Sequence, residues 1–275
     1  MPTARTPPRF AILTLAALLA ACAGTPEPPT SEAAIGELRP GIVRGYLDRA
    51  ALPDSLALLP APPAAGTPAL AADEAAYRDT RPMLATPRGA LAKADARLDF
   101  PAAATVFACA ADLDIGAETT PHLYTLLRRT LADAGLSTYR AKDHYQRTRP
   151  FVQHKQASCT PDEEARLAKD GSYPSGHSAL GWAWALVLAE LMPERADALL
   201  QRGHAFGQSR VVCGVHWQSD VAAGRVMGAA AVARLHADAV FQAQMRAAAD
   251  EIRAARSAGR RTGSDCGAQS AALAR

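Results

Sequence analysis

This sequence contains few aromatic residues and almost no excess of positive or negative charge. Aromatic residues are 5% of the 275 residues, and the formal net charge is only +3, with no block of lysine or arginine. So small a positive surplus argues against a nucleic-acid partner. Clear alternation of apolar and polar residues, typical of strands, is lacking, whereas alanine, the strongest helix former, is abundant. We therefore expect an all-α fold, built as a single-domain helical bundle.

Hydrophobic runs long enough to cross a bilayer are lacking as well. The apolar run FAILTLAALLAA, residues 10–21, has 12 residues and follows two arginines, a pattern typical of an export signal. Its end, LAAC at residues 19–22, resembles the bacterial lipobox, in which the cysteine is lipidated. We expect residues 1–21 to be a lipoprotein-type signal peptide and Cys22 to carry the lipid. A plain secretory signal is the alternative.

The segments that flank the core differ from it in composition. Residue 23, after the lipobox cysteine, is not aspartate, which by resemblance to Gram-negative sorting signals allows the outer membrane. We expect a periplasmic protein that contacts the membrane only through this N-terminal anchor; a soluble periplasmic or secreted protein is the alternative. Residues 22–44 are predicted to be a tether, residues 45–256 the folded domain and residues 257–275 a loose C-terminal tail.

Three polar segments carry residues suited to chemistry on an anion. In the first, KDHYQRTRP, Lys142 and Arg149 are seven positions apart, which on a helix places both cations on one face. Pro150 would then end that helix. A solvated basic face explains this segment equally well when it is taken alone.

The second segment is PSGH, residues 174–177, which directly precedes an apolar run. Ser175 is a good N-cap, and the N–H groups of Gly176 and His177 would then point outward at the positive end of a helix dipole. Such a helix end binds anions. An ordinary helix start with an unrelated histidine is the simpler interpretation of this segment alone.

The third segment is SRVVCGVHWQSD, residues 209–220. His216 and Asp220 have the i, i+4 spacing that lets a carboxylate reach an imidazole, which would leave the other ring nitrogen as a nucleophile or base. Arg210 adds a planar donor suited to phosphate. A buried His–Asp pair beside a surface arginine would give the same pattern.

Together the segments read Lys-x6-Arg-Pro, Pro-Ser-Gly-His and Ser-Arg-x5-His-x3-Asp, the signature of the phosphatidic acid phosphatase type 2 (PAP2) and vanadium haloperoxidase superfamily. The flanking stretches GYLDRAALPDSLALLPAPPA, DEAAYRDTR and RGHAFGQSRVVCGVHWQSDVAAGRV resemble the bacterial class A non-specific acid phosphatases. This resemblance covers residues 45–253. It implies a helical bundle of the PAP2 type, hydrolysis of small phosphomonoesters at acidic pH, no metal or other cofactor, and a homodimer.

The resemblance also implies a role for each motif residue. His216 would be the nucleophile that forms a phosphohistidine, Asp220 would orient it, and His177 would protonate the leaving group and then activate water. The phosphoryl oxygens would be held by the remaining motif residues: Lys142, Arg149, Ser175, Gly176 and Arg210. Because any hydroxyl can intercept a phosphoenzyme, transfer of phosphate to alcohols is also expected.

The cysteines other than Cys22 are even in number, which in an exported chain suggests two disulfides. Their spacing fits no zinc motif. We expect Cys159 to pair with Cys213, both within or between the motif segments, and Cys109 with Cys266, although the sequence leaves all three pairings open. Two other functions also stay open: a vanadate-dependent haloperoxidase, and a non-catalytic envelope lipoprotein that binds phosphate groups.

Overall fold

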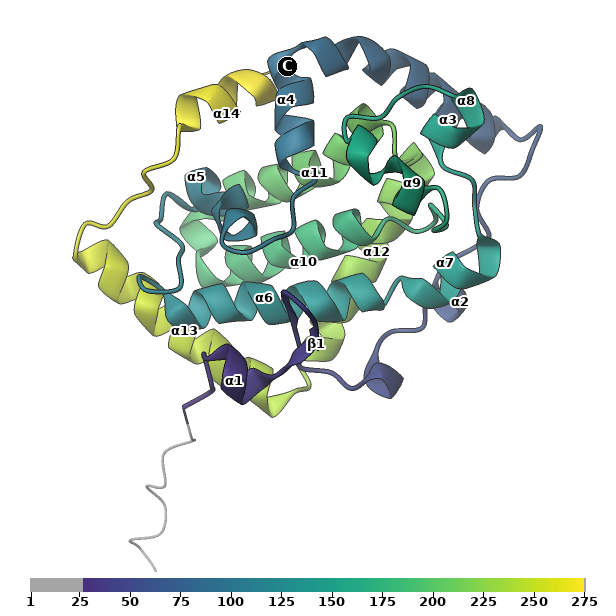
Figure 1. The fold of residues 1–275 in the computed structure, drawn as a ribbon. Helices are drawn as coiled ribbons and strands as arrows, with labels where there is room; N and C mark the ends of the chain where they lie inside the picture. Colours follow the sequence, from purple (N-terminus) through teal and green to yellow (C-terminus); the bar gives the residue numbers. More distant parts are fainter. Residues whose placement is uncertain (1–26, 275) are drawn as a thin grey trace, which may run out of the picture.

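The computed structural model describes residues 27–274, whose regular secondary structure is almost entirely helical (Figure 1). The expected all-α fold is confirmed. The predicted signal peptide and Cys22 lie outside the described residues. The helices are α1 (Glu32–Ile35), α2 (Ser55–Leu58), α3 (Pro68–Thr80), α4 (Pro87–Ala94), α5 (Ala108–Ala111), α6 (Pro121–Leu136), α7 (Tyr139–Tyr145), α8 (Pro150–His154), α9 (Glu164–Leu167), α10 (Gly176–Leu191), α11 (Ala196–Cys213), α12 (Gln218–Leu235), α13 (Ala239–Ser257) and α14 (Cys266–Leu273). The strands β1 (Glu37–Arg39) and β2 (Ile42–Val43) form one antiparallel hairpin.

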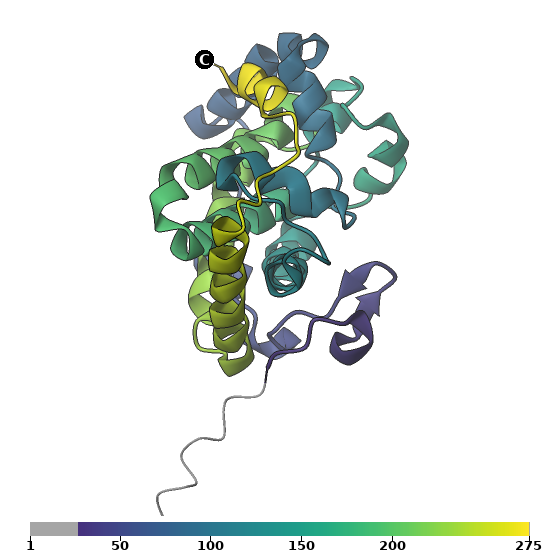
Figure 2. The same cartoon turned by 90° about the vertical axis from the view of Figure 1, so that its left-hand side faces the viewer.

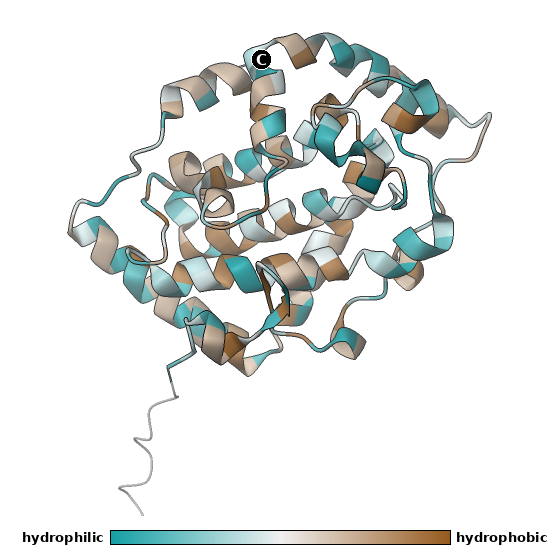
Figure 3. Ribbon diagram, in the orientation of Figure 1, coloured by the Kyte–Doolittle hydropathy of each residue, from teal (hydrophilic) through white to brown (hydrophobic). Residues whose placement is uncertain are grey.

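Helix α10 lies at the centre of the bundle and packs against α6, α11 and α12. Its sequence is apolar on nearly all faces, and its middle residues are buried, with Trp184 fully inaccessible. The indole N–H of Trp184 donates to the carbonyl of Leu127 in α6 at 2.9 Å, so the one polar atom of this side chain is satisfied. Figure 3 shows the hydropathy of the residues along the helices, with α10 in the middle of the bundle.

Small residues bring α10 and α12 into very close contact near the start of α10. A Cβ atom on Gly224 would lie 2.4 Å from the carbonyl oxygen of Ser175, and one on Gly228 would lie 2.3 Å from that of Ala179. The backbone N–H of Ser175 donates to the carbonyl of Asp220 at 3.0 Å. The N-terminal ends of α10 and α12, which carry two of the motif segments, are therefore held side by side.

Part of the predicted tether is folded. Residues 32–43 form α1 and the hairpin, which lies against α6 (Figure 2). Arg128 of α6 pairs with Glu32 at 3.0 Å, and the hydroxyl of Thr125 donates to the carbonyl of Thr30 at 3.2 Å. Contacts with a helix of the bundle thus order a segment whose composition favours a flexible chain.

The C-terminal tail is also more ordered than its composition predicts. Asp265 caps α14, which packs on α4, and a disulfide joins Cys266 to Cys109. The second disulfide joins Cys159 to Cys213. Both pairings are those expected from the sequence. Within residues 27–274, no helix combines the length and apolarity needed to span a membrane.

The contact between α10 and α12 gives a stability prediction. We expect Gly224→Ala to lower the free energy of unfolding by about 1–3 kcal/mol, because the new methyl group would collide with backbone rather than a movable side chain. Gly135→Ala in α6 is the control: its Cβ would meet nothing within 4 Å, so helix propensity should raise stability by about 0.5–1 kcal/mol. Urea unfolding measures both, and a Gly224→Ala protein as stable as the original would refute the close contact.

Candidate active site

The structure brings the three motif segments together around the N-terminal end of α10. Lys142 lies in α7, Arg149 precedes α8, and Arg210 lies in the last turn of α11. His216 occupies the turn between α11 and α12, and Asp220 lies in the first turn of α12. All five of these side chains are buried, whereas His177 at the start of α10 is partly exposed.

The expectation that Lys142 and Arg149 share one helix is wrong. Helix α7 ends at Tyr145, where Gln146 adopts the left-handed conformation with φ 43°, and Pro150 begins α8 rather than ending a helix. Proline suits the first helical position, where its missing N–H is not needed. The two cations still meet: Lys142 Nζ and Arg149 Nη2 both donate to the carbonyl of Gly171, at 2.7 and 3.3 Å.

Asp170 is the carboxylate nearest to this pair of cations and was not singled out in the sequence. Its Oδ2 lies 3.2 Å from Arg149 Nη2 and 3.9 Å from Lys142 Nζ. The pKa of Lys142 is lowered to about 8, first by burial and then by the positive charge of Arg149, with Asp170 acting in the opposite direction. The cations are therefore only partly neutralised by the protein.

Two partners fix the tautomer of His216. Arg149 Nη1 lies 3.1 Å from Nε2, and because a guanidinium can only donate, Nε2 carries no proton. The carboxylate of Asp220 lies 3.4 Å from Nδ1, which carries the proton. Burial, followed by the positive charge of Arg149, holds the pKa of His216 well below its usual value. His216 is thus a neutral imidazole whose Nε2 lone pair faces the cations.

Asp220 depends on Arg147, a residue that the sequence analysis missed. Arg147 Nη1 donates to Asp220 Oδ1 at 2.6 Å, and Nη2 donates to Asp73 Oδ2 at 2.8 Å. Ser219 completes the buried network through its N–H, 2.7 Å from Asp73 Oδ1. Burial raises the pKa of Asp220, and the charge of Arg147 lowers it. A buried carboxylate in the third motif needs such a cation, and the KDHYQRTRP segment contains this one.

Among the motif cations, Arg210 has the fewest hydrogen-bond acceptors within the described residues. It is 1% exposed, and its Nε and Nη1 atoms have no hydrogen-bond partner among the described residues. Burial, followed by the positive charge of Arg149, lowers its pKa to about 10, although the charge of Glu163 acts in the opposite direction. A buried guanidinium with unused donors is a site for an anion.

The start of α10 has the features expected for anion binding. Ser175 is the N-cap, its hydroxyl accepting from the N–H of Ser178, while the N–H groups of Gly176 and His177 have no acceptor among the described residues. A Cβ on Gly176 would meet only Thr138 Oγ1, at an ordinary 3.6 Å. Nothing described in the protein thus requires glycine here, whereas close approach of a ligand to the backbone would.

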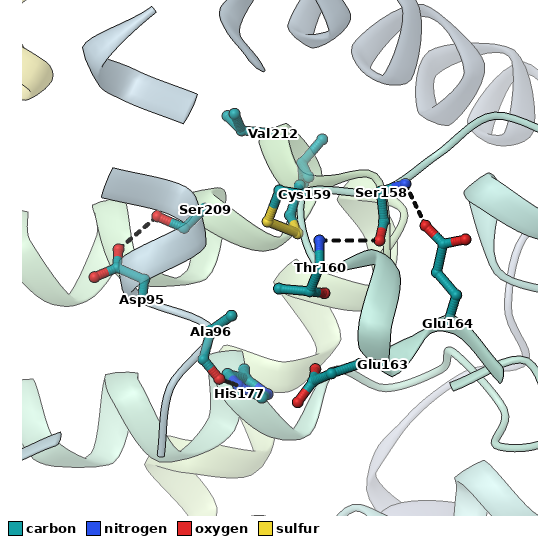
Figure 4. Close-up of a disulfide and its surroundings, with 12 residues drawn as sticks. Asp95, Ala96, Ser158, Cys159, Thr160, Glu163, Glu164, His177, Ser209 and Val212 are labelled. Carbon is teal, nitrogen blue, oxygen red and sulfur yellow. Dashed lines mark hydrogen bonds between the residues drawn. A yellow bond between two sulfur atoms is a disulfide. The ribbon is translucent and has the colours of Figure 1, made fainter. Parts of the chain in front are cut away.

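His177 faces a backbone carbonyl. Its Nε2 lies 3.0 Å from the oxygen of Ala96, a contact that the sequence did not indicate (Figure 4). Burial, followed by the positive charge of Arg210, holds the pKa of His177 well below its usual value, with the charge of His216 acting in the same direction. The two histidines and the three cations therefore share one electrostatic environment.

The disulfide between Cys159 and Cys213 fastens the segment before Asp170 to the end of α11 (Figure 4). The N–H of Cys159 also donates to the carbonyl of Cys213 at 3.0 Å. Since Arg210 lies one turn before Cys213, this link connects the chain that carries Asp170 and Gly171 to the helix that carries Arg210.

The Arg147 network gives a testable prediction. Without its guanidinium the pKa of Asp220 should rise further, so the carboxyl would be protonated at acidic pH and would no longer offset the positive charge that develops on His216. We expect Arg147→Met to lower kcat/KM for phosphate esters about 10–100-fold, the range seen for outer partners of metal-bound histidines, and to move the acidic limb of the pH profile to higher pH.

Arg147→Lys is the matched control, because it keeps the charge and loses the planar fork. Its acidic limb should move less than that of Arg147→Met. An Arg147→Met enzyme whose pH profile is unchanged would show that Arg147 does not set the ionisation of Asp220.

Comparison with known proteins identifies the family of this chain. The family model described as PAP2 superfamily matches residues 122–243. The chain is 45% identical over 208 residues to a non-specific acid phosphatase of Providencia stuartii, covering 75% of this chain and 84% of the relative. It is 43% identical to an acid phosphatase of Zymomonas mobilis (74% and 77% covered) and 43% identical to a non-specific acid phosphatase of Salmonella typhimurium (70% and 78%). With such identity across most of each sequence, the chain belongs to the bacterial class A acid phosphatases of the PAP2 superfamily.

Proposed function

We propose that this acid phosphatase hydrolyses small phosphomonoesters in two steps, through a phosphohistidine on His216 and without a metal ion. One observation carries the proposal: the same buried cluster contains a neutral, oriented His216 and an Arg210 whose Nε and Nη1 have no partner among the described residues. A nucleophile and an anion site in one buried cluster are what phosphoryl transfer requires.

In the first step, His216 Nε2 attacks phosphorus and the bond from phosphorus to the ester oxygen breaks. His177 gives a proton to the departing oxygen, which leaves as an alcohol. The negative charge on the three phosphoryl oxygens is met by Lys142, Arg149, Arg210 and the free N–H groups of α10. Asp220 accepts from Nδ1 and offsets the positive charge that develops on the ring of His216.

In the second step, His177 takes a proton from water, the water oxygen attacks phosphorus, and the bond to Nε2 breaks. Inorganic phosphate leaves and His216 returns to its neutral form. An alcohol in place of water gives a new phosphate ester by the same route, so transfer to alcohols is part of the proposal.

Acidic pH should favour this reaction. His177 must be protonated in the first step, and its pKa lies well below the usual value before substrate binds. The protonated fraction falls as pH rises through that pKa, so a lowered pKa moves the alkaline limb of activity to lower pH. Bound phosphate opposes the positive charge of Arg210 and favours protonation.

The two other candidate functions have less support. Relatives with the sequence identities given above are called phosphatases, which favours hydrolysis over halide oxidation. Vanadate should therefore inhibit the enzyme rather than activate it. A protein that only binds phosphate would not need an oriented, unprotonated imidazole beside its anion site.

Export, the lipid on Cys22, the outer-membrane location and the homodimer remain predictions from the sequence. The proposed chemistry does not depend on any of them.

The first test is of the nucleophile. We expect His216→Ala to lower kcat for p-nitrophenyl phosphate by more than about 10³-fold and to abolish acid-quenched phosphoenzyme, because the substitution removes the nitrogen that would bond to phosphorus. The unaltered enzyme should keep its activity in EDTA. A fully active His216→Ala enzyme would refute the phosphohistidine, and loss of activity in EDTA would refute metal independence.

The second test is of the anion site. Because a ligand that binds only the folded state stabilises it, inorganic phosphate should raise the Tm of the protein, and Arg210→Met should remove most of that shift. Arg225→Met is the control, since Arg225 is half-buried and, like Arg210, has an Nε without a partner among the described residues. Its phosphate shift should be unchanged. An equal shift in Arg210→Met and the unaltered protein would contradict the assignment.

A further inference from the structure

The carbonyl of Ala96 determines which nitrogen of His177 can exchange protons. A carbonyl oxygen can only accept, so Nε2 of His177, 3.0 Å away, carries a proton and donates it to Ala96. Nδ1 is then the only nitrogen of this ring left to give a proton to a departing oxygen or to take one from water. The carbonyl of Ala96 thus fixes the tautomer of His177, as the carboxylate of Asp220 does for His216.

Ala96 follows a carboxylate that is held on both oxygens. Arg202 donates to Asp95 Oδ2 at 3.1 Å and also to Oδ1. The hydroxyl of Ser209 donates to Oδ2 at 2.6 Å, as Figure 4 shows. The side chains of Asp95 and Arg202 are each only 2% exposed. Asp95 is the C-cap of α4, so this ion pair fixes the chain where it leaves that helix and presents the carbonyl of Ala96.

Both partners of Asp95 come from α11, the helix that also carries Arg210. Arg202 and Ser209 are seven positions apart, two turns of helix, and so lie on one face. Arg88 of α4 adds a second link, donating to Ser209 Oγ and to the carbonyl of Ala205, each at 3.0 Å. The orientation of His177 is thereby tied to the same helix that holds a phosphate-binding cation.

We propose that Asp95, held by Arg202 and Ser209, is a positioning residue for the general acid, acting through the Ala96 carbonyl to keep Nδ1 of His177 directed at the leaving oxygen. This inference rests on the proposed role of His177. It also gives a role to Ser209, the serine of the third motif, which touches neither histidine in the structure.

The proton balance follows from the fixed ring. Doubly protonated His177 donates from Nε2 to Ala96 and from Nδ1 to the ester oxygen, while the bond from phosphorus to that oxygen breaks and the bond from phosphorus to His216 Nε2 forms. The proton leaves with the alcohol, and Nδ1 then holds the lone pair that accepts a proton from water. The same nitrogen serves both steps, so the ring need not turn between them.

Dependence on the leaving group tests this role. A poor leaving group, such as the alkoxide of an alkyl phosphate, needs protonation, whereas p-nitrophenolate leaves without it. We expect Asp95→Asn and the milder Ser209→Ala to lower kcat/KM for alkyl phosphates by at least about tenfold more than kcat/KM for p-nitrophenyl phosphate. The quantity kcat/KM includes the steps up to departure of the alcohol, so slow hydrolysis of a phosphoenzyme does not mask the effect.

Three further variants make the result specific. His177→Asn defines the pattern of a missing general acid, with about a 10²-fold or greater loss on alkyl phosphates. Asp133→Asn and Thr125→Val remove a buried carboxylate and a buried hydroxyl outside the site, where they hold backbone groups of the N-terminal region. These two controls should lower activity on all substrates by one common factor, if they lower it at all.

Asp95→Asn and Ser209→Ala could instead lower kcat/KM equally for all leaving groups, as the controls should. That result would overturn the positioning role and leave the proposed function intact. If His177→Asn itself shows no dependence on the leaving group, the general-acid role in the proposed function fails, and the positioning role fails with it. Should Asp95→Asn not fold, Ser209→Ala alone decides the question, because it deletes one hydroxyl and leaves the Asp95–Arg202 ion pair in place.

Discussion

Buried positive charge in excess of the neighbouring negative charge is the constraint on which this site depends. Lys142 and Arg149 share the half-buried Asp170, and Arg210 makes no hydrogen bond through Nε or Nη1 to any described residue. Asp220, the other carboxylate of the cluster, is already paired with Arg147. Removing cations from water costs several kcal/mol each unless partners compensate. Lys142 and Arg149 recover part of that cost by donating to backbone carbonyls, whereas the buried guanidinium of Arg210 is left for an oxyanion to compensate.

Burial, together with this excess charge, lowers the pKa of both histidines. It favours the neutral form of His216, which is the form a nucleophile needs, and it also disfavours the protonated His177 that a general acid needs. In the proposed mechanism the substrate resolves this conflict, because its phosphate opposes the charge of Arg210 and restores the proton affinity of His177. Substrate binding and proton loading would then be one coupled event, and an empty site would hold two neutral imidazoles.

The sequence predicted those parts of the site that local rules control. N-capping by Ser175, the carboxylate of Asp220 four positions after His216, and a buried α10 all follow from short-range patterns, and the structure contains each of them. The signature also predicted that Lys142 and Arg149 would lie close together, although the single helix inferred from their spacing is wrong. Pro150 allowed either the end or the start of a helix, and the chain uses it as a start.

What the sequence could not indicate are the partners that come from distant segments. Arg147 reaches Asp73 across 74 positions, and Asp95 meets Arg202 across 107. Asp95 belongs to no motif and Asp73 only opens the flanking stretch DEAAYRDTR, and the burial of both is decided by how α3 and α4 pack on α11 and α12. The order in residues 32–43 has the same origin, since contacts with α6 outweigh a composition that favours a flexible tether. Long-range packing, rather than local propensity, places the residues that hold the motif side chains in position.

The central claim is that two imidazoles and three buried cations surround one tetrahedral oxyanion. A crystal structure of the protein with vanadate, which copies the geometry of phosphoryl transfer, tests it most directly. We predict vanadium bonded to Nε2 of His216, equatorial oxygens on Lys142, Arg149 and Arg210, and an apical oxygen within hydrogen-bond distance of Nδ1 of His177. Vanadate bound elsewhere, or bound in the cluster without contact to either histidine, would contradict it.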